Sequence, residues 1–328
     1  MALHAAIIVL TALAIFAFSH MLSSGTAAIG RRFAINPSVR GATLDAVGSS
    51  FPELCTVLVA LHAGAFDAGI GTIAGSALYN ILVIPAASVF VGGTLGIRKQ
   101  VVRRDAYLYL AVVGGLLAAA WLGPESRGEP VTHHLSMWVG LAAVLIYLGY
   151  VILLVRQARA TTSEDRRPPQ GTSASASSPW KVVLNTVVGI AGIGVSTHFL
   201  VHSSLAFFRA IGLSEAIAGV TLLAAATSLP DTLMSVFAVR RGDADGAMSN
   251  AFGSNSFDIL ICLGLPVLLV GGVEVGWEES WPLLVFLLVS TLISVLLLHT
   301  NWRLTRREGA AMAAIYLVFI VLAFTGVL

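Results

Sequence analysis

Hydrophobic runs of membrane-spanning length recur from one end of the sequence to the other, separated by short polar stretches. A helix needs about 20 mostly apolar residues to cross the hydrocarbon core of a bilayer. The pattern predicts ten such helices, at residues 4–27, 37–62, 66–93, 106–123, 134–155, 181–206, 213–239, 244–271, 282–299 and 309–328. We therefore expect an all-α polytopic membrane protein with ten transmembrane helices.

Composition excludes an ordinary soluble domain. Of the 328 residues, 57% are hydrophobic and only 11% are charged, which is too little charge for a water-exposed surface. The first hydrophobic run resembles a signal peptide in its position, but no small-x-small cleavage site follows it, so we count it as a span. The two cysteines, Cys55 and Cys262, both fall within predicted spans, which predicts packing residues rather than a disulfide framework or a metal site.

The distribution of basic residues predicts the orientation in the membrane. With the N-terminus outside and ten alternating spans, the inner loops receive 17 of the 19 Lys and Arg residues, and only Arg127 and Arg209 fall outside. An excess of Lys and Arg in cytoplasmic loops is the usual signature of orientation. We expect both termini on the outer side.

A sequence repeat divides the chain into two halves. Shifted by 178 residues, the sequence aligns with itself at His20 and His198, Gly41 and Gly219, Thr43 and Thr221, Ser50 and Ser228, and Pro52 and Pro230. Each half holds five spans, and because five is odd the second copy enters the membrane from the opposite side. The predicted units are residues 1–155, with a core repeat at 37–93, and residues 182–328, with a core repeat at 213–271. The segment between them, 156–181, is rich in Ser, Thr, Pro and charge and predicts a flexible cytosolic linker.

Two related motifs place polar groups in the middle of predicted spans. "GSSFPEL" occupies residues 48–54 and "ATSLPDT" occupies residues 226–232. Pro52 and Pro230 have no N–H, so we expect each to interrupt its helix and to free carbonyl oxygens. The acids beside them, Glu53 and Asp231, cost at least roughly 2.5–3.5 kcal/mol at membrane depth unless they have a function.

Further oxygen-bearing side chains share helix faces with these acids. Hydroxyls lie three and four residues before each acid, and the next span of each half carries polar residues four apart. These residues are Ser49, Ser50, Thr227, Ser228, Ser76, Asn80, Ser254 and Asp258. Each alone is equally explained by hydrogen bonds between helices, but their repetition in inverted halves favours a site for cations such as Ca²⁺ or Na⁺, which prefer hard oxygen ligands. Three ionised carboxylates would be neutralised by one divalent and one monovalent cation, or by three monovalent cations, which suits an exchanger.

The segments "GATLDAVGSSFPEL…GIGTIAGSALYNIL" and "AGVTLLAAATSLPDT…GSNSFDILICLGLP" resemble the two α-repeats of the calcium/cation antiporter superfamily, of the sodium/calcium exchanger type. The resemblance implies that Glu53 and Asp231 are the central calcium ligands and that Ser76, Asn80, Ser254 and Asp258 line neighbouring monovalent sites. It also implies that main-chain oxygens of Ala46 and Ala224 bind sodium, and that spans 1 and 6 slide across the ligand core. Asp231 and Asp258 are similar to residues of the potassium-dependent exchangers, which makes K⁺ a further candidate cargo.

Some positions depart from the repeat or the family pattern. The family usually has smaller residues at the positions of Phe51 and Ala226, so we expect these two side chains to narrow the ion-binding cavity. Asp45 has Leu223 as its repeat partner, so it breaks the symmetry of the repeat. The sequence predicts equally that its carboxylate lies on the entry path of the ions or that it pairs with a basic residue such as Arg40. His20 and His198 are expected to hydrogen-bond at helix crossings, with pH sensitivity as the alternative.

We expect an antiporter that exchanges Ca²⁺ for Na⁺ by alternating access in a plasma membrane, the inner membrane of a prokaryote. The alternatives are a Ca²⁺/H⁺ or other divalent cation exchanger, a channel, and an intramembrane protease, for which no His-Glu-x-x-His motif is present. The expected partners are inorganic cations and the lipid bilayer, with no enzyme activity, cofactor, nucleic acid or protein partner.

Overall fold

A computed structural model of the protein describes residues 1–33, 43–44, 46–123, 132–160, 178–299 and 302–325. Six predicted spans contain one α-helix each in the described residues, namely α1 (Ala2–Arg32), α3 (Ala46–His62), α8 (Met137–Ala160), α9 (Pro179–Ala210), α14 (Trp277–His299) and α15 (Arg306–Phe324). Nine helical segments are long and apolar enough to cross a membrane among the described residues, and α3, with 17 residues, is a shorter apolar helix. The ten predicted helices are all present.

The other four spans each contain a π-helical turn, which is labelled η. They are α4 (Phe66–Leu78), η2 (Tyr79–Val83) and α5 (Ile84–Gly92); α6 (Lys99–Val101), η3 (Val102–Ala106) and α7 (Tyr107–Leu122); α10 (Glu215–Ala218), η5 (Gly219–Leu223) and α11 (Ala224–Arg240); and α12 (Ala244–Phe257), η6 (Asp258–Leu263) and α13 (Gly264–Val270). Thr43 and Leu44 are also π-helical. Two of these turns recur at the 178-residue offset: residues 43–44 correspond to positions in η5, and η2 corresponds closely to η6.

The prolines of the two motifs do not interrupt their helices, contrary to the prediction. Pro52 lies inside α3 and Pro230 lies inside α11, and both helices continue to their ends. The irregular backbone lies instead at the π-helical turns, where one extra residue per turn displaces carbonyls from their usual partners. Such turns are frequent at functional sites, and Asn80 and Asp258 belong to two of them.

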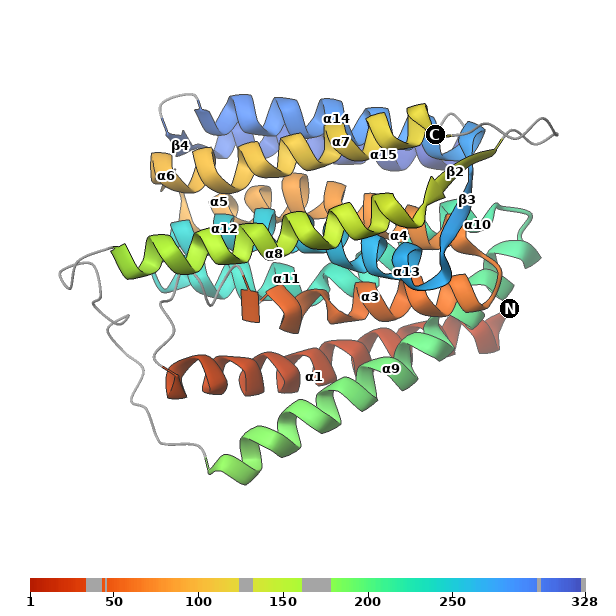
Figure 1. The fold of residues 1–328 in the computed structure, drawn as a ribbon, viewed down its shortest axis with the longest axis horizontal. Coiled ribbons are helices and arrows are strands. Elements are labelled where there is room, and N and C mark those ends of the chain that lie inside the picture. The colour runs from red at the N-terminus through yellow and green to blue at the C-terminus, as the bar shows by residue number, and fades with distance from the viewer. Residues whose placement is uncertain (34–42, 45, 124–131, 161–177, 300–301, 326–328) are drawn as a thin grey trace.

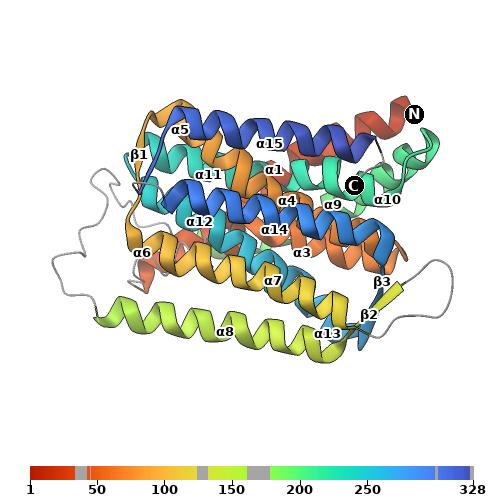
Figure 2. The same ribbon diagram turned by 90° about the horizontal axis from the view of Figure 1, so that it is seen from above.

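Two short antiparallel sheets add strands that the all-α prediction omitted. β1 (Leu95–Gly96) pairs with β4 (Arg303–Leu304), and β2 (Thr132–Ser136) pairs with β3 (Gly272–Gly276). Residues 134–136, predicted as the start of the fifth span, therefore belong to β2. Each sheet joins two loops that the charge pattern assigns to the same side of the membrane, and the two sheets lie at opposite ends of the bundle (Figure 2).

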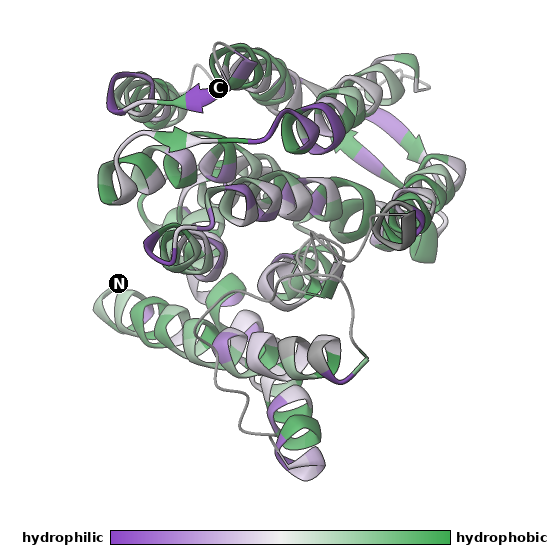
Figure 3. Ribbon diagram, turned by 90° about the vertical axis from the view of Figure 1, so that its left-hand side faces the viewer, coloured by the Kyte–Doolittle hydropathy of each residue, from purple (hydrophilic) through white to green (hydrophobic). Residues whose placement is uncertain are grey.

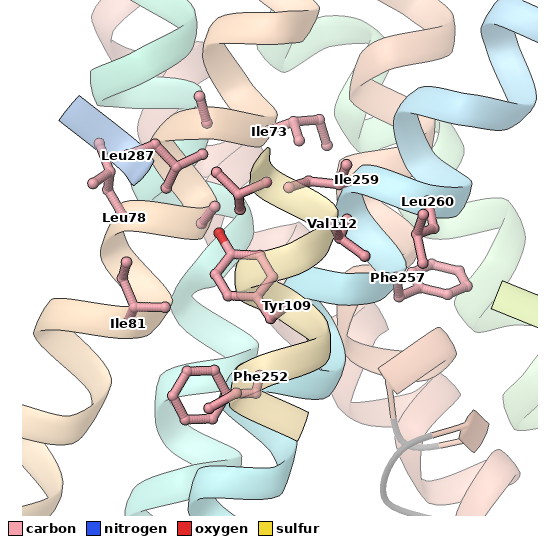
Figure 4. Close-up of a cluster of buried hydrophobic side chains, with 14 of the residues drawn as sticks. Ile73, Leu78, Ile81, Tyr109, Val112, Phe252, Phe257, Ile259, Leu260 and Leu287 are labelled. Atoms are coloured by element: carbon pink, nitrogen blue, oxygen red, sulfur yellow. The ribbon is translucent and has the colours of Figure 1, made fainter. Parts of the chain in front are cut away.

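The helices form a bundle with α1 and α9 packed along one another at its side (Figure 1). Hydrophobic residues predominate along the helices and hydrophilic stretches are short (Figure 3). One hydrophobic cluster surrounds the fully buried ring of Tyr109, whose centroid lies 6.3 Å from that of Phe252 (Figure 4). It joins α4, η2, α7, α12, η6 and α14, so the walls of the central bundle share one core.

Glycines at positions 71 and 75 allow close approach between the two halves. A Cβ atom on Gly71 would lie 2.8 Å from the carbonyl oxygen of Ala216, and one on Gly75 would overlap the carbonyl oxygen of Val220. Small residues at helix interfaces let backbones pack directly in membranes. This contact brings α4 of the first half against η5 of the second.

A buried polar cluster outside the motifs joins α12 to η3 and α8. Asp105 is 1% exposed and accepts hydrogen bonds from Tyr150 Oη (2.9 Å), Ser249 Oγ (2.8 Å) and the Arg104 guanidinium (2.5 and 2.9 Å). A buried carboxylate in a membrane is stable when it is paired and hydrogen-bonded in this way. Ser249 directly precedes Asn250, so the cluster sets the position of α12.

Replacement of Tyr150 by phenylalanine will destabilise the protein, because the buried Asp105 carboxylate loses one hydrogen-bond donor. Hydrogen bonds to charged groups contribute about 1.5–3 kcal/mol, so we expect a lower Tm in detergent, measured by differential scanning fluorimetry. Tyr107→Phe is the matched control, since Tyr107 is 40% exposed. An equal Tm for Tyr150→Phe and the wild type would contradict a stabilising role for this cluster.

Candidate ion-binding site

All twelve residues predicted for the cation site are completely buried, with 0% exposure. They are Ala46, Ser49, Ser50, Glu53, Ser76, Asn80, Ala224, Thr227, Ser228, Asp231, Ser254 and Asp258. They come from α3, α4 with η2, α11, and α12 with η6, which contact one another at the centre of the bundle. Residues far apart in the sequence are thus joined through direct contacts into one buried polar cluster.

Ser76 is the residue that connects three helices to α4. Its Oγ lies 2.8 Å from Ser228 Oγ on α11, and 3.2 Å from Glu53 Oε1 on α3, to which it donates. It also lies 3.4 Å from Asp258 Oδ2 on η6. One hydroxyl has a single proton to donate, so it cannot stabilise both carboxylates at the same time.

Asp231 is held by donors from both halves of the chain. Ser254 Oγ donates to Asp231 Oδ1 (3.0 Å) and Asn80 Nδ2 donates to Asp231 Oδ2 (3.3 Å). Asn250 Nδ2 adds a longer contact to Oδ1 at 3.4 Å and also reaches Ser235 Oγ at 3.3 Å. Asp231 therefore accepts more side-chain hydrogen bonds than Glu53 or Asp258.

The contacts follow the sequence repeat. Ser76 donates to Glu53, and Ser254, 178 residues further on, donates to Asp231, 178 residues beyond Glu53. Asn255 Nδ2 donates to the carbonyl of Ala77, its own repeat partner, at 3.0 Å. Repeat-related residues therefore meet across the centre, as expected when a binding site lies at the interface of inverted repeats.

The two predicted main-chain ligands also occupy equivalent places. Ser49 Oγ donates to the carbonyl of Ala46 at 3.3 Å, and Thr227 Oγ1 donates to that of Ala224 at 3.2 Å. A carbonyl oxygen has two lone pairs and can accept a hydroxyl while it binds a cation. The structure thus brings these carbonyls next to the motif hydroxyls.

The site has a large excess of negative charge and of oxygen acceptors. Within the described part of the chain, no Lys, Arg or His forms an ion pair with Glu53, Asp231 or Asp258. Several buried oxygens have no hydrogen-bond donor among the described residues: Glu53 Oε2, Ser50 Oγ, Asn80 Oδ1, Asn250 Oδ1 and Asn255 Oδ1. Buried polar atoms are almost always satisfied, so this concentration of free acceptors is the property of a cation site.

The ligand chemistry is that of a hard cation. In the described residues, no group of three or more Asp, Glu, His or Cys side chains is arranged to hold a metal ion by itself. Hydroxyl, amide and carbonyl oxygens must therefore supply most of the coordination, which suits Ca²⁺ with its six to eight oxygen ligands.

Sequence reasoning missed Asn250, Ser235 and Cys262 and misplaced the histidines. Asn250, Ser254, Asp258 and Cys262 are spaced four residues apart, so helical periodicity extended from Ser254 would have found the two outer members. His20 and His198, expected at helix crossings, are exposed on α1 and α9. Asp45 lies outside the described residues.

The sequence matches the family described as sodium/calcium exchanger protein over residues 3–156 and 181–325. The chain belongs to this family. The family assignment confirms the expected resemblance and makes the chain an ion antiporter of the membrane rather than an enzyme. The match omits only the segment between the halves and a few terminal residues.

Relatives along most of the chain include the putative antiporter CaxA from Alkalimonas amylolytica, 27% identical over 92% of each chain. The sodium/calcium exchanger MaX1 from Methanosarcina acetivorans is 23% identical, over 90% of this chain and 91% of that protein. The mouse sodium/potassium/calcium exchanger 4 is 37% identical over 136 residues, which are 39% of this chain and 22% of the mouse protein.

The fold is that of a solved exchanger. Structures of the sodium-calcium exchanger NCX_Mj superpose with TM-scores of 0.67 and 0.68 at 21% and 23% sequence identity, covering 97% of this chain and 98% of that one. The expected architecture of ten membrane helices in two inverted repeats is thereby confirmed.

Replacement of Glu53 by glutamine will abolish calcium transport, because the site loses a charged ligand. We expect uptake into proteoliposomes to fall at least about a hundredfold, equivalent to about 2.7 kcal/mol of lost binding. Glu278→Gln, which makes the same chemical change at an exposed position of α14, serves as the control and should transport normally. Normal calcium flux in Glu53→Gln would show that the site is assigned to the wrong residues.

Proposed function

We propose that the protein exchanges Ca²⁺ for Na⁺ across a plasma membrane, the inner membrane of a prokaryote, with the buried carboxylate cluster as the site of both ions. The observation that carries the proposal is the cluster of three buried acids, which have no basic partner among the residues that the structure describes and lie next to oxygens without a donor there. Membership of the exchanger family supports the same ions.

The contacts suggest how the ligands divide between the ions. Glu53 and Asp231, at equivalent positions of the two halves, would bind Ca²⁺ together with oxygens near Ser49 and Thr227. The binding sites for monovalent cations would be lined by residues of the π-helical turns and their neighbours: Asp258, Asn80, Ser76, Ser254 and the carbonyls of Ala46 and Ala224. Because Ser76 and Ser254 contact the acids of the calcium place as well, the two kinds of place overlap and the ions compete.

Charge couples ion binding to conformational change in this proposal. Three ionised acids without cations would carry about three negative charges through a closed state of low polarity, which is very unfavourable. A load of cations removes this penalty whether it consists of one Ca²⁺ with a monovalent ion or of three monovalent ions. Only loaded forms would then cross, which is the requirement for exchange rather than leak.

Helices α1 and α9 are suited to move across the site. Among described residues, few side-chain hydrogen bonds join α1 and α9 to the other helices. Ser23 Oγ on α1 donates to Met234 Sδ on α11 at 3.7 Å, and Arg209 near the end of α9 donates to Glu215 on α10. The equivalent residues Ser19 and Thr197 are fully buried, and their hydroxyls have no partner in the described structure. These hydroxyls are available to a hydrated ion on its way to the centre.

The remaining assignments form part of the same proposal. We infer two transport units, residues 1–155 and 182–328, joined by a cytosolic linker at 156–181, of which 161–177 lie outside the described residues. The pairing of loops from the same predicted side in β1–β4 and β2–β3 supports the alternation of the spans, and the basic inner loops support both termini outside.

Potassium is a second candidate cargo. The similarity of a 136-residue segment to the mouse sodium/potassium/calcium exchanger 4, an exchanger named for potassium, supports K⁺ as a cargo. Asp258, an acid where the first half has Asn80, supplies the extra negative charge that an additional monovalent ion needs. A proton as counter-ion is the alternative, and the same experiment separates the two.

Proteoliposomes loaded with Na⁺ will take up radioactive calcium when they are diluted into sodium-free medium. Because Asp258 provides a monovalent place, we expect external K⁺ to increase this uptake over choline, and Asp258→Asn to remove the increase while sodium-driven uptake persists. Vesicles with choline on the inside serve as the control for leak.

The possible results distinguish the alternatives. Sodium-driven uptake that ignores K⁺ would overturn potassium co-transport and leave a sodium/calcium exchanger. Uptake driven by a pH gradient and not by sodium would replace the proposal with Ca²⁺/H⁺ exchange. Calcium uptake without any exchangeable cation inside would contradict the coupling by charge.

A further inference from the structure

Cys262, a sulfur-bearing residue, lies directly beside the ion-binding site. It is 0% exposed, and its Sγ is 3.8 Å from Asp258 Oδ1 and 3.5 Å from the carbonyl oxygen of Ser50. It continues the four-residue spacing of Ser254 and Asp258 along the same helix. The π-helical turn η6, which includes both Asp258 and Cys262, keeps the thiol close to the carboxylate.

Unpartnered oxygens share this part of the site. Glu53 Oε2 and Ser50 Oγ are fully buried and have no hydrogen-bond donor among the described residues. The Asp258 carboxylate lies beside the thiol, with Oδ1 at 3.8 Å from the sulfur. The sulfur therefore faces an acceptor-rich, negatively charged space and not a purely apolar packing position.

The spacing of sulfur and oxygen suits a metal ion that binds both. With metal–sulfur distances of about 2.3 Å and metal–oxygen distances of about 2.1 Å at a tetrahedral angle, the two ligands are roughly 3.6 Å apart, close to the observed 3.8 Å. Thiolate ligands select soft and borderline cations, whereas carboxylate and carbonyl oxygens alone suit Ca²⁺.

We propose that Cys262 gives this site a sulfur ligand, so that thiophilic divalent cations such as Cd²⁺ and Zn²⁺ bind beside Asp258 in competition with Ca²⁺. The inference rests on the proposed position of the calcium site. The sulfur binds as a thiolate, and its proton is released to solution when the metal binds. Such a metal would occupy the cargo site and block calcium exchange.

A single-cysteine protein gives the direct test. Cys55 and Cys262 are the two cysteines of the chain, so in the Cys55→Ser variant any thiolate–cadmium bond must involve Cys262. We expect Cd²⁺ added to the purified variant in detergent to produce the ultraviolet absorption of a thiolate–cadmium bond, and an excess of Ca²⁺ to remove it. An absence of this absorption at saturating Cd²⁺, or absorption that Ca²⁺ does not reduce, would overturn the proposal.

Inhibition of transport gives the second readout. Because a serine keeps a hard oxygen and loses only the soft ligand, Cys262→Ser should lower the affinity for Cd²⁺ relative to that for Ca²⁺ by at least about tenfold, measured as inhibition of calcium uptake at several calcium concentrations. Cys55→Ser should keep the wild-type ratio. An unchanged ratio in Cys262→Ser would refute the sulfur ligand.

The two readouts separate this inference from the proposed exchange. If the wild type shows no sodium-driven calcium uptake but Ca²⁺ still displaces a cadmium–sulfur signal in Cys55→Ser, the exchange proposal fails and the sulfur ligand stands. If uptake is sodium-driven but the cadmium–sulfur signal is absent, the exchange proposal stands and the sulfur ligand fails.

Discussion

The constraint on which the structure depends is the burial of three carboxylates, Glu53, Asp231 and Asp258, which form no ion pair with a basic side chain in the described part of the structure. Burial of an isolated charge is among the largest unfavourable contributions in a protein interior, and it is larger still in a membrane. Hydroxyls and amides reduce this cost at Asp231, where Ser254, Asn80 and Asn250 donate, but they leave Glu53 Oε2 without a donor. The buried cluster therefore carries negative charge that bound cations would neutralise.

The inverted repeat supplies this site twice, but the two copies are not the same. Ser76 on Glu53 and Ser254 on Asp231 are equivalent contacts, whereas Asn80 in the first half corresponds to Asp258 in the second. An amide replaces an acid without a change of shape, but it removes one charge and adds two donors. The pseudo-symmetry therefore sets the positions of the polar side chains, and the difference between residues 80 and 258 sets the total charge of the cluster.

The sequence predicted the spans, and it singled out the polar residues that the structure brings together in the buried cluster, because both depend on local signals. Runs of apolar residues define the helices, and polar residues inside those runs are conspicuous. The position of the irregular backbone was not predicted: Pro52 and Pro230 suggest a break, but their helices continue, and the π-helical turns lie at Asn80 and Asp258 instead. Asp105 was also missed, because its partners Tyr150 and Ser249 are 45 and 144 residues away. Cys262 reads as a packing residue until the structure shows Asp258 beside it.

The two small sheets have a mechanical consequence. β1–β4 and β2–β3 each connect a loop of the first half to a loop of the second, at opposite ends of the bundle. The strands are next to helices α7, α8, α14 and α15 in the chain, so their pairing links these helices across the two halves at both ends of the bundle. This linkage opposes a rocking motion of one repeat against the other. Neither α1 nor α9 borders any of these strands. The strands therefore tie together helices other than α1 and α9. In the proposed exchange, the free energy of ion binding would move these two helices relative to the connected part of the molecule.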